Sequence, residues 1–273
     1  MEKSLQHKPT EEGRTVEMTD KKTPLSRLKY HQLTIEVELK VPIHFQKAPE
    51  AISKMVYSAL IKGGYREHYE HKPKNYVFSN LGKANEKGYF EDYGKIVLRS
   101  LHPKVVEQVG RSLFLYEDNI FRVLSLKSDT IGYRPIKSML TLNPVFLAMK
   151  DGNFWTFNRN GDLNQLFDAL TKNLVRKYET AFGERLDPDT HFINYFQIRN
   201  NKPMTYYFKG VKFFGNKFYI EPKMDEISQR LAFTAIGAGL GHKNSSVGGG
   251  FLKWSSGPLQ KINIETSIDE EES

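Results

Sequence analysis

The sequence has 273 residues, 39% hydrophobic and 26% charged, which is a globular composition sufficient for one large domain or two small ones. The absence of cysteine excludes disulfides, thiolate nucleophiles and cysteine-ligated metals. No apolar run is long enough to span a membrane, and the N-terminus lacks the apolar core of a signal peptide, so we expect a soluble, cytoplasmic protein.

The charge distribution indicates a polyanionic partner. The net charge is +8, and the acidic residues concentrate in the last segment, so the body of the chain is more basic than the whole. Nucleic acid is the commonest polyanion, although a lysine-rich soluble surface gives the same charge. We interpret residues 1–30, which show no apolar periodicity, as a flexible leader and residues 256–273 as an acidic tail.

Residues 31–130 have the pattern of a βαββαβ module. Apolar residues alternate from Leu33 to Val41, which predicts a strand with one buried face. A helix is predicted from Pro49 to Gly64, because proline favours a first helical turn and paired glycines end a helix. The other predicted elements are strands at 74–81, 93–101 and 119–127 and a helix at 102–114.

Residues 131–255 repeat this order of elements without repeating residue identities. The clearest element is a helix at 163–182, whose leucines and aromatic residues form one apolar stripe. The other predicted elements are strands at 138–150, 153–157, 191–199 and 250–254, a helix at 225–236, and a hairpin over 205–222 that turns at Gly215-Asn216. Two such units predict an α+β fold of two tandem ferredoxin-like, RRM-like modules with antiparallel sheets.

A glycine-rich segment, residues 237–250 (GAGLGHKNSSVGGG), joins the last predicted helix to the last predicted strand and is called the glycine loop. It does not fit a P-loop, because His242 separates Gly241 from Lys243, or a dinucleotide fingerprint, because it follows a helix. Its glycines can adopt positive φ and let another backbone approach closely. With no Asp or Glu over 227–264, the loop fits a phosphodiester cradle and equally a flexible connection in a basic protein.

The run GLGHKNSSVGGGF resembles the signature loop of the CRISPR-associated repeat-processing endoribonucleases, G-x-G-x-K-N-S-x-G-x-G, which closes the second of two ferredoxin-like modules. The resemblance covers His31 to Trp254, with one extra residue at Ser246-Val247. It implies that the loop binds RNA through Gly237, Gly239, Gly241, Lys243, Asn244, Ser245, Gly248 and Gly250.

The same resemblance implies three catalytic residues in the first module. The family places a tyrosine on the first helix, a histidine after that helix, and a lysine before a strand of the form K-x-[FY]-x-[FY]-S. Here these positions fall on Tyr57, His68 and Lys74, with His71 as a competitor for His68. The two histidines also have the spacing of metal ligands, but no third ligand follows at motif spacing. The resemblance implies neither metal nor cofactor.

These residue types suit RNA cleavage. Histidine, with an unperturbed pKa of about 6.5, can transfer protons, and lysine can donate hydrogen bonds to phosphoryl oxygens. The resemblance implies a metal-independent endoribonuclease that cleaves CRISPR repeat RNA in the precursor transcript into guide RNAs, leaving 2′,3′-cyclic phosphate and 5′-hydroxyl ends. The alternative is a non-catalytic, RNA-binding structural subunit of a CRISPR interference complex, with the other subunits as partners. Tyr57 can also simply pack at the core edge, and Lys74 can protect a strand edge.

Overall fold

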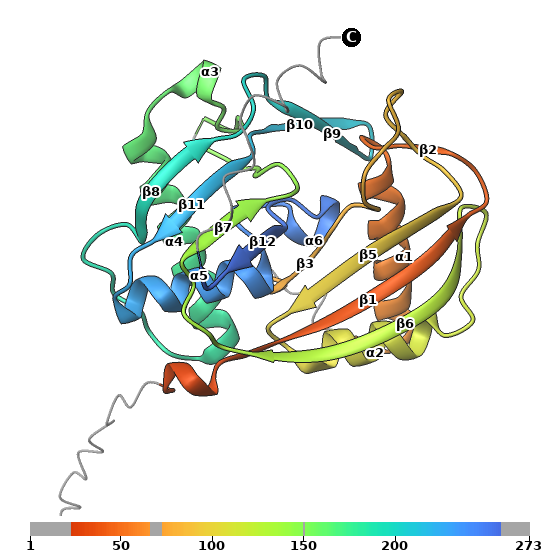
Figure 1. Cartoon of the computed structure of the whole chain (residues 1–273), viewed down its shortest axis with the longest axis horizontal. Helices are drawn as coiled ribbons and strands as arrows, with labels where there is room; N and C mark the ends of the chain where they lie inside the picture. Colours follow the sequence, from red (N-terminus) through yellow and green to blue (C-terminus); the bar gives the residue numbers. More distant parts are fainter. Residues whose placement is uncertain (1–22, 66–72, 150, 258–273) are drawn as a thin grey trace, which may run out of the picture.

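The computed structural model describes residues 23–65, 73–149 and 151–257, and its first sheet has four antiparallel strands. In spatial order they are β3 (Tyr76–Phe78), β5 (Tyr93–Ser100), β1 (Lys29–Leu39) and β6 (Phe121–Gly132). The helices α1 (Ala48–Lys62) and α2 (Pro103–Leu113) lie behind this sheet (Figure 1). The strand β1 begins at Lys29, two residues before the predicted start of the module.

The second sheet has the same arrangement. Its strands are β12 (Leu252–Ser255), β7 (Ser138–Thr141), β11 (Phe218–Pro222) and β8 (Ile193–Ile198), in that order. Two helices accompany it, α4 (Leu163–Phe182) and α5 (Glu226–Ala238). In both sheets the first and third strands of the unit are central and the second and fourth are at the edges. The predicted pair of tandem ferredoxin-like modules is therefore confirmed.

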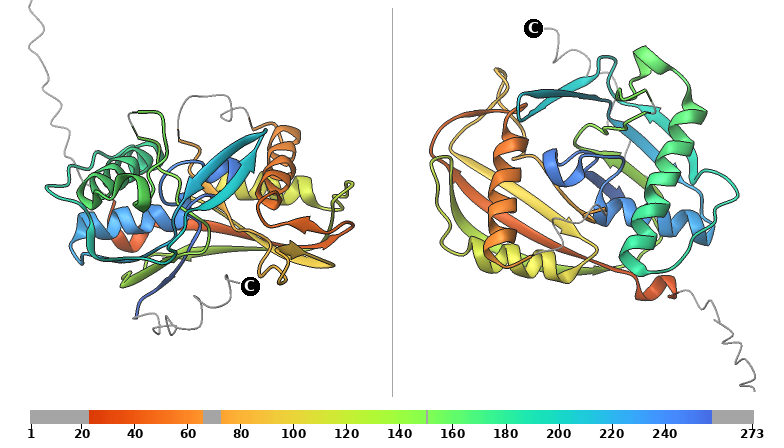
Figure 2. Two further views of the ribbon diagram at one scale, coloured as in Figure 1. Left: turned by 90° about the horizontal axis from the view of Figure 1, so that it is seen from above. Right: turned by 180° about the vertical axis from the view of Figure 1, so that it is seen from behind.

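Each module has its own hydrophobic core, and the two cores meet. Tyr30 lies on β1, Leu28 precedes this strand and Leu101 follows β5. All three nevertheless pack in the core of the second module. Gly237 of α5 lies so close to this contact that a Cβ there would be 2.4 Å from the Leu101 side chain. The view from behind in Figure 2 shows α1 and α4 on either side of the short helix α6 (Asn244–Val247). The glycine loop thus lies between the modules.

The hairpin predicted to turn at Gly215-Asn216 is wrong. The hairpin is formed by β9 (Met204–Phe208) and β10 (Val211–Gly215), and it turns at Lys209-Gly210 with φ values of 49° and 77°. A two-residue hairpin turn needs positive φ at both central residues, and Lys209 adopts it despite its side chain. Asn216 is instead fully buried and bridges Val145, so that β11 can join the main sheet.

The strands predicted at 138–150 and 153–157 are also largely wrong. Only β7 forms in the first of these ranges, because Pro144 cannot donate a ladder hydrogen bond. In the second, a single bridge joins Ala148 to Phe154, and the chain continues into α3 (Phe157–Asn160). The remaining small elements are η1 (Leu25–Arg27), β2 (Ile43–His44) and β4 (Tyr89–Phe90).

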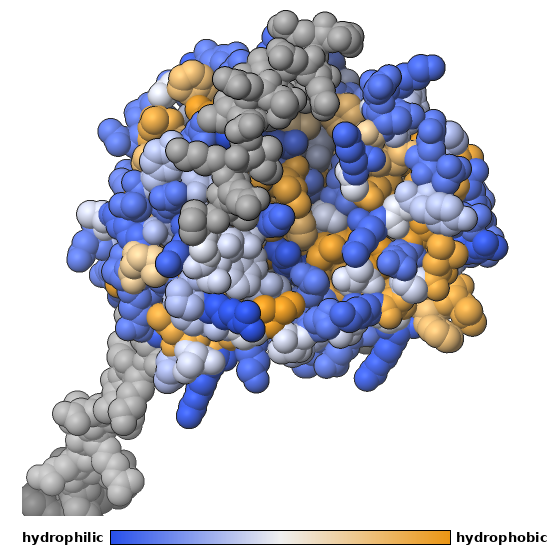
Figure 3. All heavy atoms as spheres, viewed as in Figure 1, coloured by the Kyte–Doolittle hydropathy of each residue, from blue (hydrophilic) through white to orange (hydrophobic). Residues whose placement is uncertain are grey.

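The open side of the two sheets is mainly hydrophilic, with apolar patches in the middle of the face and toward its lower right edge (Figure 3). Among the helices of the described ranges, none combines the length and apolar character required to cross a membrane.

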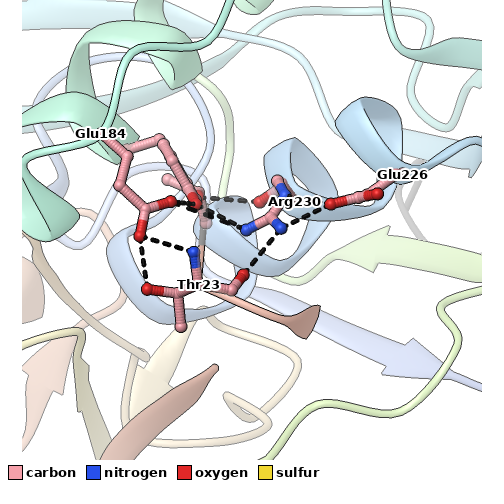
Figure 4. Close-up of polar contacts among 6 residues, drawn as sticks. Thr23, Glu184, Glu226 and Arg230 are labelled. Atoms are coloured by element: carbon pink, nitrogen blue, oxygen red, sulfur yellow. Dashed lines mark hydrogen bonds and ion pairs between the residues drawn. The ribbon is translucent and has the colours of Figure 1, made fainter. Parts of the chain in front are cut away.

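A buried arginine fastens the N-terminal segment to the second module (Figure 4). Arg230 of α5 is 1% exposed and donates to the Thr23 carbonyl at 2.7 Å, to Glu226 Oε1 at 2.5 Å and to the Tyr178 hydroxyl at 2.7 Å. Glu184, which follows α4, lies 3.8 Å from the same guanidinium and accepts hydrogen bonds from the Thr23 amide and hydroxyl. The chain is therefore held on the second module just before β1 enters the first sheet.

Candidate functional site

The glycine loop is an ordered part of the core rather than a flexible connection. Gly239, Gly241, Gly248 and Gly250 have φ values from 63° to 83°, the region that glycine alone adopts without strain. A Cβ on Gly248 would be 2.3 Å from the Phe78 carbonyl oxygen, and one on Gly250 would be 2.0 Å from the Leu240 carbonyl oxygen. The expected close backbone approach is present, and the approaching backbone is the protein's own.

Two asparagines fix the loop. Asn244 donates from Nδ2 to the carbonyl oxygens of Leu240 at 3.1 Å and Gly249 at 2.7 Å, which ties the start of the loop to its end. Asn143, in the segment after β7, donates to the Gly248 carbonyl at 2.8 Å and to the Phe78 carbonyl of the first module at 3.2 Å. These contacts hold the loop against β3, the strand that follows Lys74.

A pocket of about 280 Å³ opens at this junction. Its walls come from the segment leading into β3, from one face of α4 and from the glycine loop. The lining residues are Pro73, Lys74, Asn75, Tyr76, Asn173, Arg176, Lys177, Gly241, His242, Lys243, Asn244 and Ser245. None of these described residues is acidic, and four are Lys or Arg, so the pocket favours anions.

The pocket also contains unsatisfied hydrogen-bond acceptors. The Oδ1 atoms of Asn75 and Asn173 are buried and have no hydrogen-bond partner in the part of the chain that the structure describes. Asn75 is 2% exposed and has a φ of 51°. Because buried polar groups normally find partners, these two oxygens would accept hydrogen bonds from a ligand after a local shift that exposes them to the pocket. The site therefore offers cations for an anionic group and amide oxygens for a donor.

His242 is an electrically neutral wall of the pocket. Burial, reinforced by the nearby charges of Lys177, Lys243 and Arg176, lowers the pKa of His242 to about 4. Its Nδ1 accepts a hydrogen bond from the Ala148 amide at 3.0 Å, which assigns the proton of the neutral ring to Nε2. The imidazole can therefore donate one hydrogen bond without carrying charge.

Lys177 lies beneath the loop. It is 5% exposed, and its Nζ donates to the carbonyl oxygens of Gly239 and Gly241 and to Asn244 Oδ1, each at 2.7 Å. Burial lowers its pKa to about 7.

The structure brings one predicted catalytic residue together with part of the predicted RNA-binding loop. Lys74 lines the pocket with Gly241, Lys243, Asn244 and Ser245. Tyr57 lies on α1, is 38% exposed and is not among the lining residues, although it is near enough to lining residue Tyr76 to contribute to the raised pKa of that buried phenol. His68 and its competitor His71 lie outside the described residues. Their catalytic roles, like that of Tyr57, stay predictions.

The other loop glycines lie away from the pocket lining. Gly237 is within α5, and Gly239, Gly248 and Gly250 are buried against protein atoms. The predicted role of these four glycines in RNA binding stays a prediction, and from these positions they would act by setting the shape of the loop.

Sequence reasoning missed seven residues of the pocket lining: Pro73, Asn75, Tyr76, Asn173, Arg176, Lys177 and His242. Asn75 follows Lys74 directly, so the motif that singled out the lysine also pointed to it. His242 was visible within the glycine loop, but it served only to exclude a P-loop. The three α4 residues had no signal of their own, because a helix pattern does not show which turn of the helix faces another module.

No protein-family profile matches the sequence, and no curated protein matches it. Solved structures do resemble it. A structure described as "CRISPR associated protein Cas6" is 20% identical with a TM-score of 0.61, covering 83% of this chain and 99% of that one. "An RAMP protein binding different RNA substrates" is 15% identical with a TM-score of 0.63, covering 82% and 99%. A Cas6-related protein from Pyrococcus furiosus is 18% identical with a TM-score of 0.60, covering 83% and 98%.

The chain has the fold of Cas6 and RAMP proteins. The similarity extends over nearly the whole length of each of these structures, so both modules and their mutual arrangement are included.

Proposed function

We propose that the protein is an endoribonuclease that binds CRISPR repeat RNA in the precursor transcript and cleaves it without a metal ion. The observation that carries the proposal is the pocket, where Lys74 of the first module meets the glycine loop of the second on a Cas6-like fold. Lys74 and the glycine loop come from distant parts of the chain, and both line this pocket.

The chemistry of the pocket suits an RNA backbone. Lys74, Arg176 and Lys243 supply positive charge for phosphate groups, and no acidic residue of the described lining opposes them. Once a local shift exposes them to the pocket, the amide oxygens of Asn75 and Asn173 would accept hydrogen bonds from a ribose hydroxyl or from an amino group of a base. The pocket volume of about 280 Å³ is on the scale of a single nucleotide rather than a duplex.

RNA carries its own nucleophile for this reaction. The 2′-oxygen forms a bond to phosphorus while the bond from phosphorus to the 5′-oxygen breaks, which leaves a 2′,3′-cyclic phosphate and a 5′-hydroxyl. A base takes the 2′-hydroxyl proton, and an acid gives a proton to the 5′-oxygen. We assign one of these proton transfers to His68, with Tyr57 as its partner, and we assign Lys74 to the phosphoryl oxygens, where negative charge develops.

The test is cleavage of CRISPR repeat RNAs in EDTA by the wild-type protein and by His68→Ala, His71→Ala and Lys74→Ala. We expect wild type to cleave in EDTA, and His68→Ala and Lys74→Ala to bind RNA but to lose at least about a hundredfold in rate. His31→Ala is the matched control, because His31 is on β1 and outside the pocket lining. A substrate with a 2′-deoxyribose at the cleaved position should bind and stay intact.

The outcomes separate the two functions. Cleavage in EDTA that His68→Ala leaves unchanged would remove His68 from the mechanism, and loss of cleavage in His71→Ala would transfer the role to its competitor. Tight RNA binding by the wild-type protein with no cleavage under any condition would contradict the enzyme. That result would support the structural subunit, which the position of Tyr57 outside the pocket lining favours.

A further inference from the structure

The glycine loop supplies an acceptor for every N–H group of the Lys177 ammonium. A protonated lysine has three N–H donors, and Lys177 Nζ has three loop acceptors at 2.7 Å, the carbonyl oxygens of Gly239 and Gly241 and Asn244 Oδ1. A neutral amine has only two N–H groups, so its lone pair would face one of these oxygens. The observed conformation of the loop therefore requires the charged lysine.

The contacts extend from Lys177 through the whole loop. Asn244 accepts from Lys177 through Oδ1 and donates through Nδ2 to Leu240 and Gly249, so the lysine sets the orientation of the amide. The amide also packs closely on the loop backbone, since a Cβ on Gly239 would be 2.5 Å from Asn244 Nδ2. Loss of the ammonium would leave three buried oxygens without this donor, in a segment that otherwise lacks space to rearrange.

Within residues 23–65, 73–149 and 151–257, no carboxylate lines the pocket or accepts a hydrogen bond from Lys177. Its hydrogen-bond acceptors are all neutral. The charged or titratable groups that share its pocket are Arg176 on its own helix, His242 and Lys243 on the loop, and Lys74 and Tyr76 at the entrance to β3. None of these supplies a negative charge near neutral pH, because Tyr76 has a pKa raised by burial. Burying a charge without a counter-ion is unfavourable for stability, so stability alone does not account for a lysine here.

We propose that Lys177 is a positioning residue that holds the glycine loop in its pocket-lining conformation, and that a phosphate group of bound RNA provides a counter-charge that the described residues do not supply. The second part rests on the proposed function, because it needs RNA in the pocket. Lys177 acts on RNA indirectly, by holding the loop and by the electrostatic attraction of its positive charge, whereas Lys74 and Lys243 are the residues placed to contact phosphate.

The affinity for RNA should depend on pH through Lys177. Burial lowers the pKa of Lys177 to about 7 in the free protein, and a phosphate in the pocket would raise it again. The bound state then holds more protons than the free state, so RNA affinity is highest below pH 7 and falls as the pH rises above it. The fall is at most about tenfold per pH unit for one proton. His242 does not produce this step, because it is already neutral above its pKa of about 4.

The experiment compares Lys177→Met with Lys172→Met, a matched control on the exposed face of α4. Two quantities are measured: amide hydrogen exchange over residues 239–250, and the affinity for a labelled CRISPR repeat RNA from about pH 6 to about pH 9. All affinities are measured in the His68→Ala, His71→Ala background with RNA that carries a 2′-deoxyribose at the cleaved position, so that the RNA stays intact and neither histidine titrates. We expect Lys177→Met to lose exchange protection in the loop but not in β1 and β5, to bind RNA about tenfold more weakly at pH 6, and to lose the pH dependence seen with Lys177. Lys172→Met should keep all three properties.

Unchanged loop protection in Lys177→Met would overturn the positioning role, whatever the RNA affinity. Lost protection together with an RNA affinity that depends on pH as before would overturn the counter-charge. Lost protection in a protein that never bound RNA would leave the positioning role intact and contradict the proposed function instead. If Lys177→Met does not fold, the affinity profile of the protein with Lys177 decides, since a flat profile from about pH 6 to about pH 9 would overturn the proposal by itself.

Discussion

Gly250→Ala is the sharpest test of the structural role of the glycine loop. Gly250 has a φ of 65°, and a Cβ there would be 2.0 Å from the Leu240 carbonyl oxygen. This oxygen cannot move away easily, because it accepts from Asn244 Nδ2, and Leu240 donates its amide to the Gly250 carbonyl at 3.1 Å. The alanine therefore meets backbone that is already held in place.

The expected magnitude follows from two separate terms. An alanine at positive φ costs about 1–2 kcal/mol, and forcing an extra methyl group into a packed core costs about 1–3 kcal/mol more. Gly183→Ala separates the two, because Gly183 ends α4 with a φ of 69° and has no atom within 4 Å of its added Cβ. We expect losses of about 3 kcal/mol for Gly250→Ala and about 1 kcal/mol for Gly183→Ala.

The assay is urea unfolding of both variants and the wild-type protein, followed by circular dichroism, together with RNA affinity at one salt concentration. A chain of this size with ordinary stability tolerates both substitutions, so each variant should be folded before urea is added. Gly250→Ala should also weaken RNA binding, while Gly183→Ala should not. Equal losses of stability in the two variants would refute the reasoning, since the close approach at Gly250 would then contribute nothing.

Three further predictions concern ionisable residues. Lys243→Gln should reduce the slope of log affinity for RNA against log salt by about the value for one phosphate, whereas the control Lys172→Gln should not. An unchanged slope in Lys243→Gln would contradict a phosphate contact and favour a structural role for Lys243, whose Nζ lies 5.0 Å from the centre of the Phe213 ring. Arg230→Met should lower the free energy of unfolding by about 3 kcal/mol, because Tyr178, Glu184 and the Thr23 carbonyl lose a buried donor. The control is Arg27→Met, at an exposed arginine, and an equal loss of stability in the two variants would refute this prediction. Because the pKa of His242 is lowered from 6.5 to about 4, the contribution of its neutral ring to stability should be fully present above pH 6.5 and be lost as the pH falls toward 4, and NMR titration of the ring should show a midpoint near 4 rather than 6.5.

The sequence was most informative where local signals and burial agree. The helix predicted at 163–182 coincides with α4, because Asp162 caps its first turn by accepting from the Gln165 amide and Gly183 ends it at positive φ. The order of strands also follows from the pattern, since each βαββαβ unit has few ways to bury its apolar face. Local sequence and tertiary packing specify the same structure there.

The failures have a common cause, which is that tertiary contacts reassign local signals. Gly215-Asn216 looks like a turn, but Asn216 is buried and pairs with Val145, and the turn falls on the less typical Lys209-Gly210. The inward stripe of α4 was predicted from apolar residues alone, so Lys177, which is buried on the same helix, had no place in it. No rule of periodicity indicates that a lysine will find three carbonyl and amide acceptors from a loop more than sixty residues later.

The glycines of the site therefore determine how the loop packs, whereas the cations supply the charge of the pocket. A glycine-rich loop with a lysine suggests that its backbone amides surround a phosphate, but here the positive-φ glycines admit protein backbone and fit the loop against β3 and Leu240. The charge of the pocket comes mostly from elsewhere, from Lys74 before β3 and from Arg176 and Lys177 on α4. Gly250→Ala, which changes the shape of the loop, and Lys177→Met, which removes its support, should therefore both weaken RNA binding. Lys243→Gln should differ from both, by altering the salt dependence while leaving the hydrogen exchange of the loop unchanged.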